Sequence, residues 1–409
     1  MKRFLSAPKT PSFPLFDSLD PTEQLLLLAS RTALSESEAE KLRVAAADDE
    51  VDWENFYDLA NFHRVFALVY RNLMLHAPEA LPPTVADDFS ERVSENNLWI
   101  IELTGELVRL SEAFDKKKIP FLPLKGPMLA ASVYGDIALR PAGDLDLLVD
   151  LRDVPAALDI LRAAGFSVVL REPGAFATPR QEAAVCRYLY HFILFDEERE
   201  LVVELHFNLS PRKLPFQVTP DELFSRASTF PVAGREIPIP HPVDNLIYLC
   251  LHGGKHAWSR VEWLVGIAEL LKQMGSIDET EVSQLARQRN ALRPLLLGLL
   301  LAAELLDTNV TPQLVREAQG DHIVRKLAQD VASQLPVTEE DPQRQNRFQL
   351  ALYPTLLARL RWVFYSSLQP GYADIRSINV EWLSLYYLIR PIRLAGKLFG
   401  KSEKVPEGS

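Results

Sequence analysis

The sequence predicts an α+β protein in which a mixed α/β unit lies between two helical regions. Apolar residues recur at helical intervals from about residue 20 to residue 118, and the same pattern returns from residue 242 to about residue 398. Between these regions, short β-prone runs alternate with helical runs over residues 119–210. We therefore divide the chain into an N-terminal helical region (1–118), an α/β core (119–240), a C-terminal helical domain (241–398) and a disordered tail (399–409).

Composition and charge indicate a globular protein that does not coat nucleic acid. The chain has 409 residues, of which 47% are hydrophobic, and a formal net charge of −11. This charge argues against a long basic binding surface but is compatible with a local basic cleft. Cys186 and Cys250 lie in apolar settings, as core residues in a reducing compartment do. The longest apolar run, 295–303, is about half a membrane span, and no apolar run of signal-peptide length stands at the start, so we expect a cytoplasmic protein without a membrane span.

The N-terminal region is expected to be helical throughout. Asp20 precedes Pro21 as an N-cap precedes the first helical residue. Residues 52–76 place large apolar side chains at helical spacing, and residues 93–118 continue as a longer helix that ends in three lysines. Cations suit the C-terminus of a helix, so this helix is expected to end there.

The α/β core begins at "IPFLPLKG", residues 119–126, which reads as a short strand running into a glycine. A helix with Pro127 in its first turn follows, and "DLDLLVD" (144–150) is a second strand. A helix closed by Gly165 leads to a third strand. After an irregular helix-like segment, residues 190–196 and 201–209 form a hairpin around the charged turn "EERE".

Two carboxylates stand at the start of the second strand. Residues i and i+2 of a strand face the same side, so Asp144 and Asp146 point together while Leu145 and Leu147 face the core. Two neighbouring carboxylates repel each other unless a cation lies between them. Mg²⁺ prefers hard oxygen ligands of this kind, so the pair is a candidate metal clamp.

A third carboxylate follows on a later strand. In "LVVELHFNL" the alternation places Glu204 and His206 on the polar face. If this strand is a neighbour of the Asp144–Asp146 strand, the three carboxylates meet, as two-metal phosphoryl chemistry requires.

Groups suited to phosphate stand in the same region. Lys125 and Gly126 lie at a strand–turn–helix junction, where backbone N–H groups attract phosphate, and Arg140 offers a guanidinium fork four residues before Asp144. Each motif alone has an ordinary structural explanation, such as a strand start or an edge strand with a solvated face. Their joint order within one α/β unit favours a nucleoside triphosphate bound with Mg²⁺.

These motifs together resemble the uncharacterised bacterial nucleotidyltransferase family of the DNA polymerase β-like superfamily. The resemblance rests on "LKG…YGD…LRPAGDLDLLVD", "VELHFNL" and "LCLHGGKHAWSRVEWLVGIAELL", and covers roughly residues 50–275. It implies a polymerase β-like mixed sheet with Gly126 at the turn, Asp144 and Asp146 as the metal pair and Glu204 as the third acid. The chain departs from the superfamily pattern with Glu204 in place of the usual aspartate. It departs again at Pro127, which has no N–H to offer a phosphate.

The segment "LHGGKHAWSR" places His252 and His256 four residues apart, on one face of a helix, with Lys255 between them. The spacing is compatible with zinc, but the metalloprotease glutamate and a cysteine partner are missing nearby. In the resembling superfamily a helical subdomain carries basic residues toward the triphosphate, which implies phosphate or acceptor contact for all three. Helix packing through the two glycines, with surface histidines, is the alternative.

Near the C-terminus, an apolar run is followed by the basic residues Arg390, Arg393, Lys397 and Lys401. It reads as a core helix with a basic end, and peripheral contact with a membrane surface is the alternative.

The predicted function is transfer of a nucleoside monophosphate from an NTP, ATP among them, to an acceptor, with release of pyrophosphate. Two Mg²⁺ ions, or Mn²⁺ in their place, would be held by Asp144, Asp146 and Glu204. The acceptor is a small molecule, a protein side chain or an RNA end. A catalytically weak nucleotide-binding or scaffold protein, favoured by Pro127, and a toxin-like tRNA-modifying nucleotidyltransferase are the alternatives.

Overall fold

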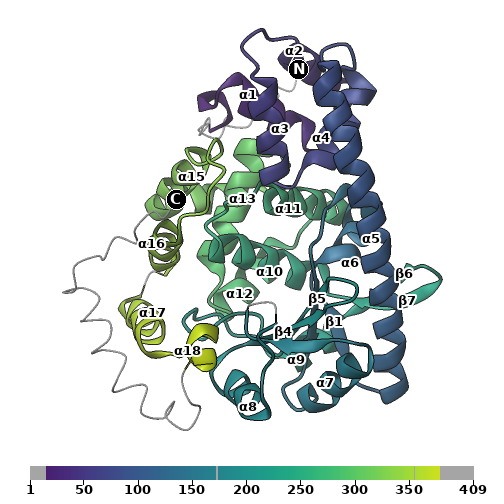
Figure 1. The fold of residues 1–409 in the computed structure, drawn as a ribbon. Coiled ribbons are helices and arrows are strands. Elements are labelled where there is room, and N and C mark those ends of the chain that lie inside the picture. The colour runs from purple at the N-terminus through teal and green to yellow at the C-terminus, as the bar shows by residue number, and fades with distance from the viewer. Residues whose placement is uncertain (1–14, 172–173, 354, 378–409) are drawn as a thin grey trace, which may run out of the picture.

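The computed structural model describes residues 15–171, 174–353 and 355–377 of the chain. Helices from both ends of the chain pack together in one half, and the sheet lies in the other half, beside the lower part of one long helix (Figure 1). The architecture is α+β with helical regions on both sides of the sheet in sequence, as predicted.

The N-terminal half of the first helical region holds four short helices, and the caps predicted from the sequence are present. Asp20 forms a capping box with Glu23 at the start of the first helix. The run 52–76 is not one continuous helix, because Arg64 adopts a left-handed conformation (φ 57°) and divides it. The four helices are α1 (Pro21–Ala29), α2 (Glu36–Ala46), α3 (Trp53–Phe62) and α4 (Phe66–His76).

The long helix α5 (Pro83–Lys117) begins ten residues earlier than the sequence pattern suggested. Pro83 stands at its first position, where a missing N–H costs nothing. It ends at the predicted lysine cluster, with Lys118 left-handed (φ 56°) as the C-cap. Phe89, near its start, packs in the helical core, and Leu107, further along, packs in the core beneath the sheet, so α5 connects the two halves of the molecule.

The main sheet is mixed and has five strands in the order β1-β2-β5-β4-β3. β2 and β5 are parallel neighbours, and the other pairs are antiparallel. The register places Asp146 opposite Glu204, so the condition for the carboxylates to meet is fulfilled. The strands are β1 (Phe121–Pro123), β2 (Leu145–Val149), β3 (Ser167–Val169), β4 (His191–Asp196) and β5 (Leu201–His206).

Short helices connect these strands. The predicted helix after Gly126 is brief, because α6 (Gly126–Leu129) passes at once into a π-turn at Ala130–Tyr134, followed by a 3₁₀ turn at Ile137–Leu139. The remaining elements are α7 (Val154–Ala163), α8 (Pro179–Tyr188), α9 (Pro220–Arg226) and a separate hairpin of β6 (Ser228–Val232) and β7 (Arg235–Ile239). Prolines within both strands of this hairpin weaken the strand pattern in the sequence, and the hairpin was not predicted.

The C-terminal helices are α10 (Pro242–Lys255), α11 (Val261–Met274), α12 (Glu279–Gln288), α13 (Leu292–Leu306), α14 (Pro312–Gly320), α15 (His322–Ala332), α16 (Pro342–Leu352), α17 (Leu356–Leu368) and α18 (Tyr372–Ser377). The strongly apolar α13 packs against α10, α11, α12, α14 and α15. None of the helices in the described ranges is both long and apolar enough to cross a membrane. The basic residues from Arg390 to Lys401 and the predicted tail lie outside the described residues.

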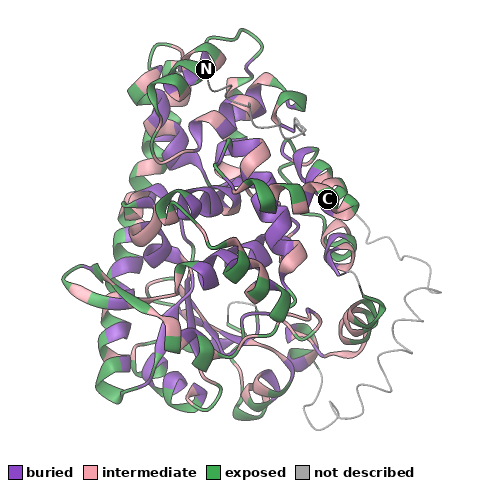
Figure 2. Cartoon of the chain, turned by 180° about the vertical axis from the view of Figure 1, so that it is seen from behind, coloured by how far each residue is buried: buried purple, intermediate pink, exposed green. Residues whose placement is uncertain are grey.

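Buried residues fall into two hydrophobic clusters. One joins the N-terminal helices to the C-terminal ones and includes Leu26, Phe56 and Leu299. The other lies around the sheet and includes Leu145 and Leu147, whose side chains face the core as predicted. Seen from behind, the central helices and strands are buried and the outer helices are exposed along one side (Figure 2).

Both cysteines are free thiols. Cys250 is buried and Cys186 is half-buried, so only Cys250 is the full core residue that the sequence predicted for both.

Candidate functional site

All nine residues singled out from the sequence line one cavity of about 270 Å³. They come from the β1–α6 junction, the start of β2, β5 and the end of α10. The nine are Lys125, Gly126, Arg140, Asp144, Asp146, Glu204, His252, Lys255 and His256. The i, i+2 alternation of the strands and the parallel pairing of β2 with β5 bring together groups that are up to 131 positions apart in the chain.

Asp146 is the centre of the charged groups in this cavity. Lys125 Nζ lies 3.0 Å from Asp146 Oδ2, and His206 Nε2 donates to Asp146 Oδ1 at 3.0 Å. His206 Nε2 is also 3.2 Å from Glu204 Oε2. Ligand atoms of Asp146, Glu204 and His206 all lie within 4.8 Å of one another, which is close enough to hold a single metal ion.

The pKa values of these groups follow from burial and from their partners. Burial alone would raise the pKa of Asp146, but the Lys125 ammonium and the His206 hydrogen bond lower it well below its usual range. Burial likewise opposes ionisation of Glu204, whose pKa is nevertheless lowered, chiefly by its hydrogen bond from His206. Both carboxylates are therefore ionised at neutral pH.

Asp144 differs from the other two carboxylates. It stands one residue before β2 and lines the same cavity. Burial, and then the charge of Asp146, raises the pKa of Asp144 to about 7. Its place as a metal ligand remains a prediction, since the compact group of ligand atoms comprises Asp146, Glu204 and His206.

A pair of stacked histidines lies behind the carboxylates. The rings of His191, on β4, and His206, on β5, are 5.0 Å apart and nearly parallel. Burial lowers the pKa of His191 to about 3, with the neighbouring His206 contributing. Burial also opposes protonation of His206, but its hydrogen bonds to Asp146 and Glu204 raise its pKa. His206 thus connects Asp146 and Glu204, a role that its polar-face position left unassigned. His191 was not predicted, although the alternation of "HFILFD" could have placed it on the same face.

The β1–α6 junction holds Lys125 in position. The backbone N–H of Leu124 donates to Asp146 O at 3.0 Å, which ties the end of β1 to β2. Gly126 is left-handed (φ 59°), and a Cβ there would lie 3.4 Å from the Asp144 carbonyl oxygen. Pro127 is buried at the start of α6. The junction thus presents the Lys125 side chain to the carboxylates.

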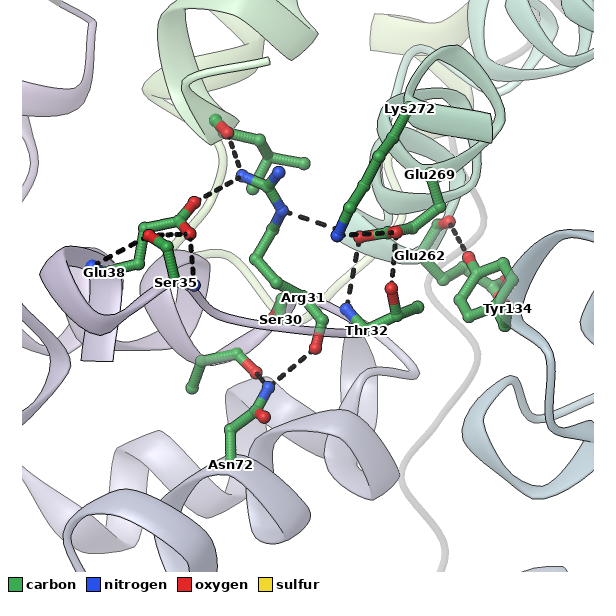
Figure 3. Close-up of polar contacts among 12 residues, drawn as sticks. Ser30, Arg31, Thr32, Ser35, Glu38, Asn72, Tyr134, Glu262, Glu269 and Lys272 are labelled. Carbon is green, nitrogen blue, oxygen red and sulfur yellow. Dashed lines mark hydrogen bonds and ion pairs between the residues drawn. The ribbon is translucent and has the colours of Figure 1, made fainter. Parts of the chain in front are cut away.

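Arg140 is already paired within the wall of the cavity. Its side chain is 7% exposed and lies 3.6 Å from Glu262 Oε2, on α11. Burial opposes its charge, but Glu262 raises the pKa of Arg140 above its ordinary value. Tyr134, whose hydroxyl donates to the Glu262 carbonyl at 3.4 Å, adds a further contact to α11 (Figure 3). The Arg140 charge is therefore balanced by Glu262 and is not free for a phosphate in this arrangement.

The end of α10 forms the opposite wall. The helix ends at Lys255, and His256 is the C-cap, so the two glycines close the helix and do not lie in its middle. The Trp258 ring covers Gly253, where a Cβ would meet it at 2.6 Å. The rings of His252 and His256 are 4.8 Å apart, and each lies 5.3 Å from Trp263.

Burial lowers the pKa of both His252 and His256 well below the ordinary value, so both rings are neutral. Burial, followed by the charge of Lys125, lowers the pKa of Lys255 to about 8. Lys255 Nζ lies 5.7 Å from the centroid of the Tyr190 ring and has no ion pair with a described residue. Lys255 is thus a cation in the wall with no carboxylate of its own.

The lining of the cavity contains six Lys or Arg side chains and five Asp or Glu side chains, although the whole chain is strongly acidic. The charged members that the sequence did not single out are Arg64, Arg171, Arg260, Glu262 and Glu340. Their positions depend on how α3, α11 and the C-terminal helices pack, and no local pattern marks them. Cationic side chains therefore outnumber carboxylates by one in this cavity, which is close to charge balance.

Comparison with known protein families gives one match. Residues 49–307 match a family described as uncharacterised nucleotidyltransferase. The matched span begins before α3 and ends just after α13, so it contains the whole sheet and every residue of the cavity except Glu340. A comparison with curated proteins finds no match.

Proposed function

This chain belongs to the uncharacterised nucleotidyltransferase family, and from that premise we propose that it transfers a nucleoside monophosphate from an NTP to a hydroxyl acceptor, with release of pyrophosphate. The observation that carries the proposal is the meeting of Asp146 and Glu204 on adjacent parallel strands, with Lys125 beside them and Asp144 in the same cavity. This arrangement supplies anionic groups for a metal ion and cationic groups for phosphate within one enclosed space.

The residues present suit a divalent cation. Asp144, Asp146 and Glu204 would hold Mg²⁺ through hard carboxylate oxygens, and the imidazole of His206 makes Mn²⁺ a suitable alternative. His206 Nδ1 is buried and has no hydrogen-bond partner among the described residues, whereas Nε2 faces the two carboxylates. When bound, the metal supplies charge stabilisation at the phosphate under attack.

The chain's own residues bind and orient the nucleotide. We assign Lys255 to the triphosphate, because it faces the cavity without a carboxylate partner. Lys125 neutralises Asp146 in the free protein and can turn to a phosphate once a metal ion takes up the carboxylate charge. The neutral rings of His252 and His256, with Trp263 tilted against them, offer aromatic contacts for a base or an acceptor.

Positioning then accounts for the chemistry. The acceptor oxygen forms a bond to the α-phosphorus, and the bond from that phosphorus to the bridging oxygen breaks in line with it. Its electron pair leaves with pyrophosphate, and the proton of the acceptor hydroxyl passes to water. The acceptor classes that this proposal admits are a small molecule, a protein side chain and an RNA end.

A second candidate is a nucleotide-binding protein with weak catalysis. Two observations favour it. Pro127 removes one backbone N–H from the phosphate-facing turn, and Arg140 is held by Glu262. Under this alternative the cavity binds a nucleotide without transferring it.

The test combines binding with transfer. The protein is incubated with each α-³²P-labelled NTP, with Mg²⁺ or Mn²⁺, and with small hydroxyl compounds, protein and tRNA as acceptors. We expect label on an acceptor, and loss of more than 100-fold of that transfer in Asp146→Asn. The control is Asp150→Asn, because Asp150 lies at the other end of β2 and pairs with Arg152. It should transfer label at nearly the wild-type rate.

Each other outcome assigns a different function. Metal-dependent nucleotide binding without transfer would support the second candidate. Label on tRNA would identify a toxin-like enzyme, and label on the chain itself would indicate self-modification. Neither binding nor transfer in the wild type would refute both candidates.

A further inference from the structure

A second cavity adjoins the proposed nucleotide site. Its volume is about 440 Å³, and it shares Arg64, Pro141 and Ala142 with the first cavity. Gly143, which also lines it, is bonded directly to Asp144. The wall between the two cavities is therefore the short loop that leads into β2.

This loop is held from the side of α5. Trp99 Nε1 donates to Ala142 O at 2.7 Å, and Asn96 Nδ2 donates to Ala138 O at 3.0 Å. Both side chains line the second cavity. The same two residues of α5 therefore form part of this cavity and hold the loop that leads into β2. None of the three carboxylates of the proposed metal site lines the second cavity, but Gly143, which does, directly precedes Asp144.

The lining indicates what kind of molecule fits. Trp99, Phe66 and Pro141 provide apolar and flat surfaces. Arg64 and Arg92 provide two guanidinium groups against one carboxylate, Glu95, which pairs with Arg92 at 3.1 Å. Arg92 lies over the Phe66 ring, 5.0 Å from its centroid, so its fork faces this cavity's aromatic edge. Arg64, whose side chain is 44% exposed, lies 3.8 Å from Glu262. Arg140 contacts the same carboxylate at 3.6 Å, so the two arginines share one negative charge and the lining keeps one positive charge in excess.

Size also separates the classes of acceptor. A cavity of about 440 Å³ falls in the range of roughly 300–1,000 Å³ that encloses small molecules. A folded protein or an RNA stem would instead need an open surface.

We propose that this second cavity is the acceptor site, and that the acceptor is a small hydroxylated molecule with an apolar or planar face and one anionic group, a carboxylate or a phosphate. The inference rests on the proposed function and names its substrate class. The acceptor's hydroxyl oxygen bonds to the α-phosphorus at the edge that the two cavities share, which Arg64, Pro141 and Ala142 line. The bond to the bridging oxygen breaks, pyrophosphate leaves with the electron pair, and the hydroxyl proton goes to water.

Two variants test the cavity by charge and by volume. Arg92→Glu reverses a charge, and Asn61→Trp fills space, and both residues line the second cavity without lining the first. Lys116→Glu is the matched control, because it reverses an exposed charge on the same helix, where Lys116 pairs with Glu112. Label transfer is measured with hydroxy acids and sugar phosphates, with neutral sugars, with aminoglycosides, and with tRNA and protein.

We expect the wild type to label an anionic small molecule. Arg92→Glu should raise the KM for that acceptor at least tenfold, and Asn61→Trp should lower kcat/KM by a similar factor. The Kd of a fluorescent NTP analogue should stay within twofold of the wild-type value in both variants and in the control.

The two proposals fail in different ways. If the wild type does not bind a nucleotide, both the proposed function and this inference are refuted. If the wild type binds the nucleotide but labels only neutral or cationic compounds, tRNA or protein, the proposal of an anionic small acceptor is wrong. The same holds if it binds the nucleotide and labels nothing. Labelling of an anionic acceptor with the same KM in Arg92→Glu, Asn61→Trp and Lys116→Glu overturns the cavity as its site.

Discussion

At the scale of single residues, the cavity is organised by the competition of several cations for two ionised carboxylates. Asp146 takes Lys125 and His206, and Glu204 shares His206. Lys255 remains without a carboxylate among the described residues and keeps its charge at neutral pH only by a small margin. Lys255 is half-buried, and its charge supports the proposal that it contacts a triphosphate.

Lys255 leads to a pH-dependent prediction. Burial, and then the charge of Lys125, lowers its pKa to about 8. Below that pH the ammonium is protonated and attracts a triphosphate, and above it the charge is lost. The Kd of a non-hydrolysable NTP analogue should therefore rise between pH 7.5 and pH 9, by at most about tenfold per pH unit. In Lys255→Met, affinity at pH 7 should be about 10- to 100-fold weaker, as expected for a lost charged hydrogen bond.

The shape of the pH profile is the decisive readout, measured by isothermal titration calorimetry at constant ionic strength. Lys255→Met should be flat between pH 7.5 and pH 9. Lys272→Met, a lysine on α11 whose side chain is 49% exposed, should reproduce the wild-type rise. A profile of Lys255→Met parallel to that of the wild type would show that another group titrates.

At the scale of elements, the end of α10 illustrates how a glycine pair is used. The sequence pattern "HGGKH" indicated that something approaches the backbone closely. The structure shows that it is the Trp258 ring on Gly253 and Leu352 on Gly254. Trp258 N also donates to Gly253 O at 2.8 Å, which closes the helix. The close approach is therefore a packing feature that holds Lys255 and His256 at the cavity wall.

Substitution of each glycine by alanine should change the free energy of unfolding by a different amount. A Cβ at Gly253 would lie 2.6 Å from the rigid Trp258 ring, whereas one at Gly254 would lie 3.0 Å from the flexible Leu352 Cδ1. Gly253→Ala should lower the free energy of unfolding by about 1–3 kcal/mol through overpacking. Gly254→Ala should change it by less than about 1 kcal/mol, because the gain in helix propensity offsets a small side-chain shift.

Urea denaturation followed by circular dichroism measures both variants, and the wild-type chain is the reference. Equal destabilisation by the two substitutions would show that Trp258 does not pack against Gly253 in solution. Gly253→Ala should also weaken nucleotide binding, since a shift of Trp258 displaces the residues that follow Gly254.

At the scale of the whole molecule, the helices from the two ends of the chain share one core. The first cluster of buried residues includes side chains from α1 to α4 and from α10 to α16. Polar contacts connect the same parts. Arg31 and Thr32, after α1, contact Glu269 on α11, and Arg31 also donates to the Leu306 carbonyl (Figure 3). The helix α11 thus carries Glu262 at the cavity and Glu269 at the contact with the N-terminal helices. We propose that the N-terminal helices support the cavity wall through α11.

Arg31 and Lys272 give a matched test of this connection, because both lie beside the Glu269 carboxylate. Arg31 lies 3.6 Å from it and is 12% exposed, whereas Lys272 lies 3.9 Å from it and is 49% exposed. Removing the buried partner leaves the buried Glu269 carboxylate with the half-exposed Lys272 and the donors of Thr32, so Arg31→Met should lower the free energy of unfolding by about 3 kcal/mol. Lys272→Met should cost less than about 1 kcal/mol, as exposed ion pairs do.

Denaturant titration followed at two positions provides the measurement, with one fluorescent label on α2 and another on α15. The midpoints at both positions should move together in Arg31→Met. A shift at the α2 label alone would show that the two groups of helices unfold independently.

Local patterns determined much of the fold and of the site. Strand alternation placed Asp144 with Asp146 and Glu204 with His206, because the i, i+2 relation is a property of the strand itself. Capping residues and helical spacing indicated α1, α5 and the helices from α10 onward, because the 3.6-residue period is likewise a property of the helix itself. The family resemblance, confirmed over residues 49–307, supplied the mixed sheet and the roles of its acidic residues as expectations.

Only the tertiary structure decided which charges meet. The partner of Arg140 is Glu262, 122 positions away, and the second cavity is formed by α3, α5 and the loop before β2. Such contacts depend on how separate elements pack, and packing responds to the shape of every side chain between them. The sequence by itself therefore determined the type of protein and the residues of its carboxylate centre. The paired or free state of each cation, and the space beside the nucleotide site, were set by tertiary contacts that no local pattern encodes.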